Sequence, residues 1–182
     1  MSIRRPLWSC TDNGIMFIGD AACQVNPIHG GGIGPSMMGG AKAGQVIIGA
    51  VEKGDVSREA LWPYTGMFME EYGAKQAGLD IFRILLQRLS NKEMNYGMRH
   101  HLITDEDLLK ASMGEDLKLN ITEKTGRLFK GLGSLSLLKK LNATAKIMKE
   151  IKALYRNYPS SPEGLKEWEE KTRALVEKAK KL

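Results

Sequence analysis

The chain has 182 residues, of which 42% are hydrophobic, and a formal net charge of +6. This length suits one ordinary domain, or a small core with a helical appendage, and it excludes two full α/β domains. No apolar run approaches the roughly 18 residues that a membrane span needs, and the N-terminal stretch lacks the apolar core of a secretory signal. We therefore expect a cytoplasmic protein.

The positive charge is concentrated towards the C-terminus. Between Lys139 and Leu182 there are twelve Lys and Arg residues against six Glu residues, so this segment carries the whole excess. Such a tail is suited to contact with anionic lipid headgroups or nucleic acid, although a solvated face of amphipathic helices is the commoner reason for the pattern. A peripheral contact with a membrane is one expectation for this segment, and no nucleic acid partner is expected.

The cysteine and histidine residues do not form a metal-binding pattern. Cys10 and Cys23 are thirteen residues apart, with no Cys-x-x-Cys motif and no histidine cluster nearby. This spacing predicts two reduced thiols. His100 and His101 are adjacent in sequence and would point to different sides of a helix. We expect no metal site.

The first predicted elements are a strand, a loop and a helix. The apolar run from Ile15 to Ile18 follows the turn-forming residues 12–14 and predicts one buried strand entered from a hairpin. Residues 19–34 are too rich in glycine for a regular element, so they are predicted to form a loop. Pro35 suits the first turn of a helix that should extend to Val51. Glycines in a helix cost up to about 1 kcal/mol each relative to alanine. This predicted helix contains Gly39, Gly40, Gly44 and Gly49. Because these glycines are costly, they imply that the helix packs closely against a sheet or a ligand.

Beyond residue 54 the pattern changes to helices. Ser57 is a predicted N-cap, and apolar residues recur at helical spacing from Trp62 to Leu89. Residues 104–107 predict a cap and a further helix. The last two predicted helices flank a break at residues 157–162, and their apolar stripes are Leu137, Leu141, Met148, Ile151 and Tyr155, then Leu165, Trp168, Leu175 and Ala179. We expect Trp168 to pack in the core and anchor the last helix.

The pattern predicts an incomplete α/β fold. A single strand leaves backbone donors unpaired unless other strands complete its sheet, and the sequence offers almost no strand signal after residue 20. We therefore predict an α/β fragment, in which a strand, a glycine-rich loop and a helix occupy residues 1–54. A mostly α-helical region would occupy residues 55–182. The chain is expected to be the back part of a larger protein.

The loop is suited to bind a polar ligand. The glycines precede a helix N-terminus, whose free N–H groups and dipole attract an anion or a developing negative charge. Asp20, at the end of the strand, adds a carboxylate acceptor. This set fits a ligand with hydroxyl groups and a charge-accepting carbonyl, and it fits a phosphate poorly. No Gly-Lys-Ser/Thr closes the loop, so a nucleotide P-loop is excluded. The alternatives are that Asp20 only forms a turn or cap and that the glycines only pack closely.

At these residues the sequence resembles the geranylgeranyl reductases, which are FAD-dependent enzymes similar in fold to the aromatic hydroxylases. The resemblance rests on the second flavin-binding motif of that family, represented by Gly19-Asp20, Ala21-Ala22, Asn26-Pro27 and Gly30-Gly31-Gly32-Ile33. It implies that Asp20 hydrogen-bonds the ribityl chain of FAD. It also implies that the backbone at Gly32 and Ile33 meets the pyrimidine edge of the isoalloxazine ring. Gly19 and Gly31 are included with them as cofactor-binding residues.

Within that family the archaeal branch, which saturates the geranylgeranyl chains of membrane ether lipids, is the most similar. The resemblance implies that reduced flavin delivers a hydride to an isolated C=C bond of an isoprenoid lipid held in a dry cavity. It identifies no proton donor, and it does not distinguish a nicotinamide from a ferredoxin as electron donor.

The Gly-x-Gly-x-x-Gly fingerprint that would bind the ADP part of FAD is missing from the chain. We therefore expect a truncated enzyme, or one half of a split enzyme whose N-terminal half another chain supplies. The alternatives are a binding or assembly module and another flavoprotein of the same fold, such as an electron-transfer dehydrogenase.

Overall fold

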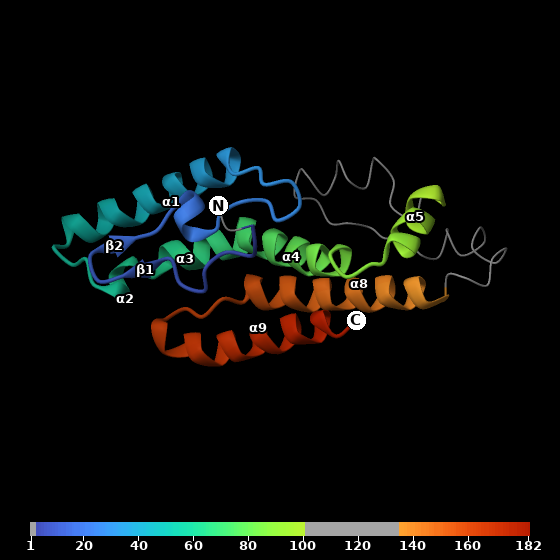
Figure 1. Ribbon diagram of the computed structural model, residues 1–182. Helices are drawn as coiled ribbons and strands as arrows, with labels where there is room; N and C mark the ends of the chain where they lie inside the picture. The colour runs from blue at the N-terminus through green and yellow to red at the C-terminus, as the bar shows by residue number, and fades with distance from the viewer. Residues whose placement is uncertain (1–2, 101–134) are drawn as a thin grey trace.

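The computed structural model describes residues 3–100 and 135–182. Figure 1 shows α1 on one side of α3 and α4, with α8 and α9 on the other side. The helix predicted from Thr104 and the residue His101 lie outside the described residues. The elements in chain order are β1 (Thr11–Asp12), β2 (Ile15–Met16), the 3-10 turn η1 (Gly19–Ala22), α1 (Ile33–Glu52), α2 (Arg58–Leu61), α3 (Pro63–Phe68), the π-helical turn η2 (Met69–Gly73), α4 (Ala74–Leu86), α5 (Asn91–Arg99), α8 (Leu135–Arg156), the 3-10 turn η3 (Pro162–Gly164) and α9 (Leu165–Lys180).

The predicted hairpin forms, but its strand is not buried. β1 and β2 pair antiparallel, with Thr11 opposite Met16, across the turn in which Gly14 has a φ of +68°. The predicted burial of the run is wrong, because Ile15, Phe17 and Ile18 are 46%, 36% and 37% exposed. Within the described residues β2 has β1 as its only partner strand, so no sheet covers these side chains.

Helix α1 begins two residues before the predicted start and ends at Glu52. The prediction of close packing at its glycines is right at Gly39, where a β-carbon would collide with the amide oxygen of Gln24. At Gly40, Gly44 and Gly49 no heavy atom of the described residues lies within 4 Å of a β-carbon position, so no described residue packs closely there. These three glycines face open space, because only one side of α1 packs on the rest of the fold.

Ser57 caps α2 by accepting a hydrogen bond from the backbone N–H of Ala60 at 3.3 Å, as predicted.

The predicted long helix between Trp62 and Leu89 is present with one irregularity. Between α3 and α4 the helix widens into the π-helical turn η2. Wide turns of this kind are rare and often lie at functional sites.

Helix α5 is absent from the predicted elements, although its start carries a clear signal. The Ser90 hydroxyl accepts from the backbone N–H of Glu93, and the Glu93 carboxylate accepts from the backbone N–H of Ser90. This reciprocal arrangement is a capping box, which the sequence Ser-x-x-Glu encodes.

The main core lies where α4 packs against α8 and α9. The predicted apolar stripe of α8 is buried. Trp168 of α9 is 4% exposed and donates its indole N–H to the carbonyl of Leu154 at 2.9 Å, so its predicted role as an anchor is confirmed. None of the described helices is long and apolar enough to cross a membrane.

A buried carboxylate fixes the N-terminal segment to this core. Asp80 of α4 is fully buried and accepts hydrogen bonds from Arg5 at 3.0 Å and from Arg83 at 2.7 Å. A buried charge is tolerated only when it is paired in this way. Arg5 therefore holds the residues that lead into the hairpin against α4, while Arg83, which lies on α4 itself, pairs with the other oxygen of the carboxylate.

Candidate functional site

The turn at Gly19 and Asp20 is held tightly against α1. Gly19 has a φ of +64°, which favours glycine, and a β-carbon there would lie 3.0 Å from the Ser36 hydroxyl oxygen. The turn is closed by a hydrogen bond from the Gln24 backbone N–H to the Gly19 carbonyl at 2.9 Å. The positive φ and the close approach of Ser36 explain why a glycine precedes Asp20.

The side chain of Gln24 holds this turn in place through buried hydrogen bonds. It is fully buried, its Oε1 accepts from the Gly19 backbone N–H at 2.8 Å, and its Nε2 donates to the Tyr64 hydroxyl at 2.8 Å. Tyr64 in turn donates to the Phe17 carbonyl at 2.9 Å. Burial raises the pKa of Tyr64 above its usual value, so the phenol keeps the proton that it donates. The network joins the strand, the turn and α3.

The glycine loop is closed on itself by Asn26. Its backbone N–H donates to the Gly31 carbonyl and its carbonyl accepts from Gly30, each at 2.9 Å. Its side-chain oxygen accepts from the Ile28 backbone N–H at 2.9 Å. This arrangement places residues 30–32 directly before α1.

The structure brings two of the predicted site residues together. A β-carbon at Gly32 would lie 3.2 Å from Asp20 Oδ1 and 3.1 Å from Val25 Cγ1. Asp20 is exposed, and no other described residue forms a hydrogen bond or ion pair with its carboxylate. Gly32 thus forms a surface without a side chain beside an acceptor that is free to bind a ligand.

Ile33 and Gly34 supply the donors of this site. Gly32 is the N-cap of α1, and no side chain caps the helix. The first N–H groups of a helix have no intrahelical acceptor, and the positive end of the helix dipole lies there. The Ile33 side chain is 83% exposed, so the approach to these groups is open on that side.

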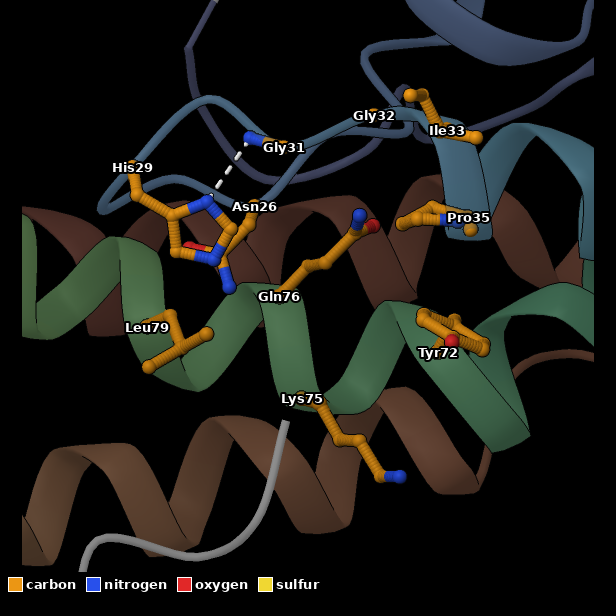
Figure 2. A pocket seen from close by; sticks show the side chains of 11 residues that line it. Asn26, His29, Gly31, Gly32, Ile33, Pro35, Tyr72, Lys75, Gln76 and Leu79 are labelled. Carbon is orange, nitrogen blue, oxygen red and sulfur yellow. Dashed lines mark hydrogen bonds between the residues drawn. The ribbon is translucent and has the colours of Figure 1, made fainter. Parts of the chain in front are cut away.

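A pocket of about 330 Å³ lies between this helix N-terminus and the helix formed by η2 and α4. Figure 2 shows Gln76 extending from α4 towards Pro35 and Ile33, with His29 and Asn26 on the loop opposite Leu79. Of the predicted residues, Gly31, Gly32 and Ile33 line this pocket, whereas Asp20 and Gly19 do not. His29, to which no role was assigned, also lines it and accepts from the Gly31 backbone N–H at 3.0 Å.

Sequence reasoning did not identify the residues that α4 and η2 contribute to the pocket. They are Tyr72, Lys75, Gln76 and Leu79, and the Lys75 ammonium lies 5.7 Å from the centre of the Tyr72 ring. One available signal was the spacing of Tyr72 and Gln76, which at four residues apart share a helix face. Gln76 is also, with Asp80, one of only two polar side chains among the described buried residues of α4.

Cys10 and Cys23 lie near this region but are not suited to react there. Both thiols are unpaired and buried. Burial raises the pKa of Cys10 to about 12, so its thiol is neutral at physiological pH and a poor nucleophile. No group of three metal-ligating side chains occurs among the described residues.

The chain is similar to several curated proteins, whereas no family model matches it. It is 52% identical to a digeranylgeranylglycerophospholipid reductase of Sulfolobus acidocaldarius over 91% of this chain and 36% of that protein. It is 34% identical to one of Methanoculleus marisnigri over 82% of this chain and 32% of that protein. A third, of Methanothrix thermoacetophila, is 37% identical over 64% of this chain and 29% of that protein. The chain therefore spans about a third of the length of the curated relatives it matches.

Proposed function

Because the chain is a homologue of archaeal proteins named digeranylgeranylglycerophospholipid reductase, we propose that it is part of an FAD-dependent reductase. Its substrates would be the C=C bonds of geranylgeranyl chains in membrane lipid precursors. The observation that carries the proposal is the pairing of Asp20 with Gly32 at the uncapped N-terminus of α1. The resemblance noted above independently assigned these two residues to one flavin site.

The residues present fit the flavin and the ribityl chain. Asp20 supplies an unengaged carboxylate, which is an acceptor for hydroxyl groups such as those of a ribityl chain. The backbone N–H groups of Ile33 and Gly34 are donors for a ring carbonyl. Gly32 leaves the Asp20 carboxylate uncrowded, because a β-carbon there would lie 3.2 Å from Asp20 Oδ1 and 3.1 Å from Val25 Cγ1.

Bound flavin would supply the hydride for reduction of an isolated C=C bond. The contribution of this chain to that chemistry is positioning. Asp20 would fix the ribityl chain, and the α1 N-terminus would stabilise negative charge at the pyrimidine edge. Leu79 and Tyr72 would limit the access of water to the pocket.

The surface of the chain supports its being part of a larger assembly. The outer face of α1 exposes the apolar side chains of Met37, Ile48 and Val51, which are 71%, 61% and 63% exposed. Ile15 of β2 and the two residues that follow the strand, Phe17 and Ile18, are exposed as well. Large apolar side chains left exposed in this way are typical of an interface. We propose that a dinucleotide-binding segment, in the same polypeptide or in another chain, covers it and binds the ADP part of FAD.

The proposal is tested by co-expressing the chain with the part of the Sulfolobus acidocaldarius relative that it does not match. We expect a complex that retains FAD through gel filtration, measured by flavin absorbance. After reduction with dithionite, a geranylgeranyl lipid should reoxidise the flavin and gain hydrogen, measured by mass spectrometry. A fully saturated lipid is the control.

Two outcomes would contradict the proposal in different ways. A colourless complex would contradict the proposal that the chain contributes to a flavin site. A flavin-containing complex that is not reoxidised by the unsaturated lipid would support the proposed flavin site but contradict the proposed substrate. That result would favour another flavoprotein activity.

A further inference from the structure

Gln76 is a buried polar side chain without a partner among the described residues. It is 3% exposed, and neither its Oε1 nor its Nε2 has a hydrogen-bond partner in that part of the chain. Leaving a buried amide unpaired costs free energy, and such a group needs an explanation. Figure 2 shows that the amide lies on the wall of the pocket that faces the α1 N-terminus.

The pocket therefore presents an alternating set of donors and acceptors. The carboxamide of Gln76 offers an acceptor and a donor side by side, and the N–H groups of Ile33 and Gly34 offer further donors. A ligand edge that presents carbonyl, N–H and carbonyl in sequence matches this set. The N–H would donate to Gln76 Oε1, and the two carbonyls would accept from Gln76 Nε2 and from the helix N-terminus.

The remaining lining of the pocket favours a flat and uncharged or anionic group. Pro35 and Leu79 provide apolar walls, and Tyr72 provides an aromatic one. Among the lining residues within ranges 3–100 and 135–182, Lys75 is the only formally charged side chain and none carries a carboxylate. A planar ring with a partly negative edge suits these surfaces better than a cation does.

We propose that Gln76 is the side chain that recognises the imide edge of the planar heterocycle bound in this pocket. The inference rests on the proposed function, because the pyrimidine ring of a flavin carries such an edge. It adds a positioning residue on α4, which lies 56 residues after Asp20 in the sequence.

The test uses the full chain and riboflavin, which has the isoalloxazine ring and the ribityl chain but no ADP, so its binding does not require the dinucleotide fingerprint. Riboflavin is titrated against the native chain, Gln76→Leu and the control Gln45→Leu, which alters an exposed glutamine on α1. Binding is followed by NMR shifts of the backbone amides of Ile33 and Gly34. The same titrations are repeated with riboflavin methylated at the imide nitrogen.

We expect Gln76→Leu to weaken riboflavin binding by about tenfold, because the ligand loses two hydrogen bonds. The methylated ligand should bind the native chain about tenfold more weakly than riboflavin does, whereas Gln76→Leu should no longer distinguish the two ligands. The variant should not be less stable than the native chain when no ligand is present, because it removes an unpartnered buried amide. Gln45→Leu should change none of these values.

Equal riboflavin affinity for Gln76→Leu and the native chain would overturn the role of Gln76. If Asp20→Ala still weakened riboflavin binding in that case, the proposed flavin function would stand without it. Loss of folding stability in Gln76→Leu without loss of imide discrimination would show a purely structural residue and would overturn the inference. If riboflavin shifted neither helix amide at saturating concentration, the pocket would not be an imide site.

Discussion

Asp20 shows what a sequence motif can and cannot establish about a single residue. Its position after the apolar run and before the glycines identifies it as a candidate ligand-binding acceptor. The short separation from Gly32 depends on the fold of the intervening loop, which Asn26 closes through its backbone. The role of the buried Gln24 in holding the turn is not apparent from the motif, because Gln24 bonds to Tyr64, which is 40 residues away.

Replacing Asp20 with alanine should weaken flavin binding without destabilising the protein. The carboxylate is exposed and engages no described residue, so its removal breaks no contact within that part of the chain. A hydrogen bond to a charged group is worth about 1.5 to 3 kcal/mol, which corresponds to a loss of about 10- to 150-fold in affinity. Riboflavin titration and thermal unfolding measure the two quantities.

The matched control for this prediction is Glu52→Ala, which removes an exposed carboxylate at the other end of α1. It should leave both quantities unchanged. Equal riboflavin affinity for the native chain and Asp20→Ala would remove Asp20 from the site, and a large fall in the melting temperature would show that the residue is structural.

At the scale of the elements, α5 is joined to α8 by one well-formed ion pair. Lys140 of α8 donates to the Glu93 carboxylate at 2.7 Å, and Ser90 donates to it from its backbone N–H and its hydroxyl. The hydrogen bond from Lys140 is the main cause, with those from Ser90 second, of a Glu93 pKa lowered to about 2. The carboxylate is thus held in its ionised form by both helices.

This ion pair predicts a loss of stability in acid. Because the pKa of Glu93 is lower in the folded state, its contribution is present above the unfolded-state pKa of 4.5 and is lost as the pH falls from there towards 2. Carbon NMR of the Glu93 carboxyl should give a midpoint well below 4.5. The variant Glu93→Gln should be less stable than the native chain at pH 7 and lose that difference near pH 2.

The effect should be reduced by salt, because the two side chains are 25% and 23% exposed. Glu59→Gln, at an exposed position of α2, serves as the control and should leave the pH dependence unchanged. A Glu93 midpoint at its ordinary value would show that α5 is not held to α8 in solution.

At the scale of the whole molecule, the apolar face of α1 is the feature that the helical core does not explain. Its outward glycines contact nothing within the described residues, and Ile48 and Val51 are more than half exposed. Helices that expose such a face are normally covered by another layer. This face is where we propose that the dinucleotide-binding segment packs.

The double variant Ile48→Lys and Val51→Lys should therefore prevent assembly while leaving the chain folded. Charged side chains at an apolar interface would be buried without partners, so co-purification with the complementary segment should be lost. The isolated variant should also bind less of a dye that reports exposed apolar surface. Met98→Lys alters a methionine of α5 that is 69% exposed and should leave assembly intact. Assembly by the double variant at native levels would place the interface elsewhere.

The sequence by itself determined most of the helices and much of the chemistry of the site. Periodicity located α4, α8 and α9, because helical spacing is a local property of the chain, and Pro35 indicated the start of α1. The hairpin turn and the cap at Ser57 were predictable for the same reason, since each depends on a few neighbouring residues. The glycine-rich loop and Asp20 indicated a polar ligand through their composition alone.

The tertiary structure decided which of these residues meet. The exposure of the strand at Ile15 was not predictable, because burial depends on which other strands are present to cover it. The pocket was not predictable either, because Gln76 reaches the α1 N-terminus only through the packing of helices that are distant in sequence. Local sequence patterns determine local structure. A binding site is formed by contacts between segments that are far apart in the sequence, and such contacts produce no periodic pattern in the sequence.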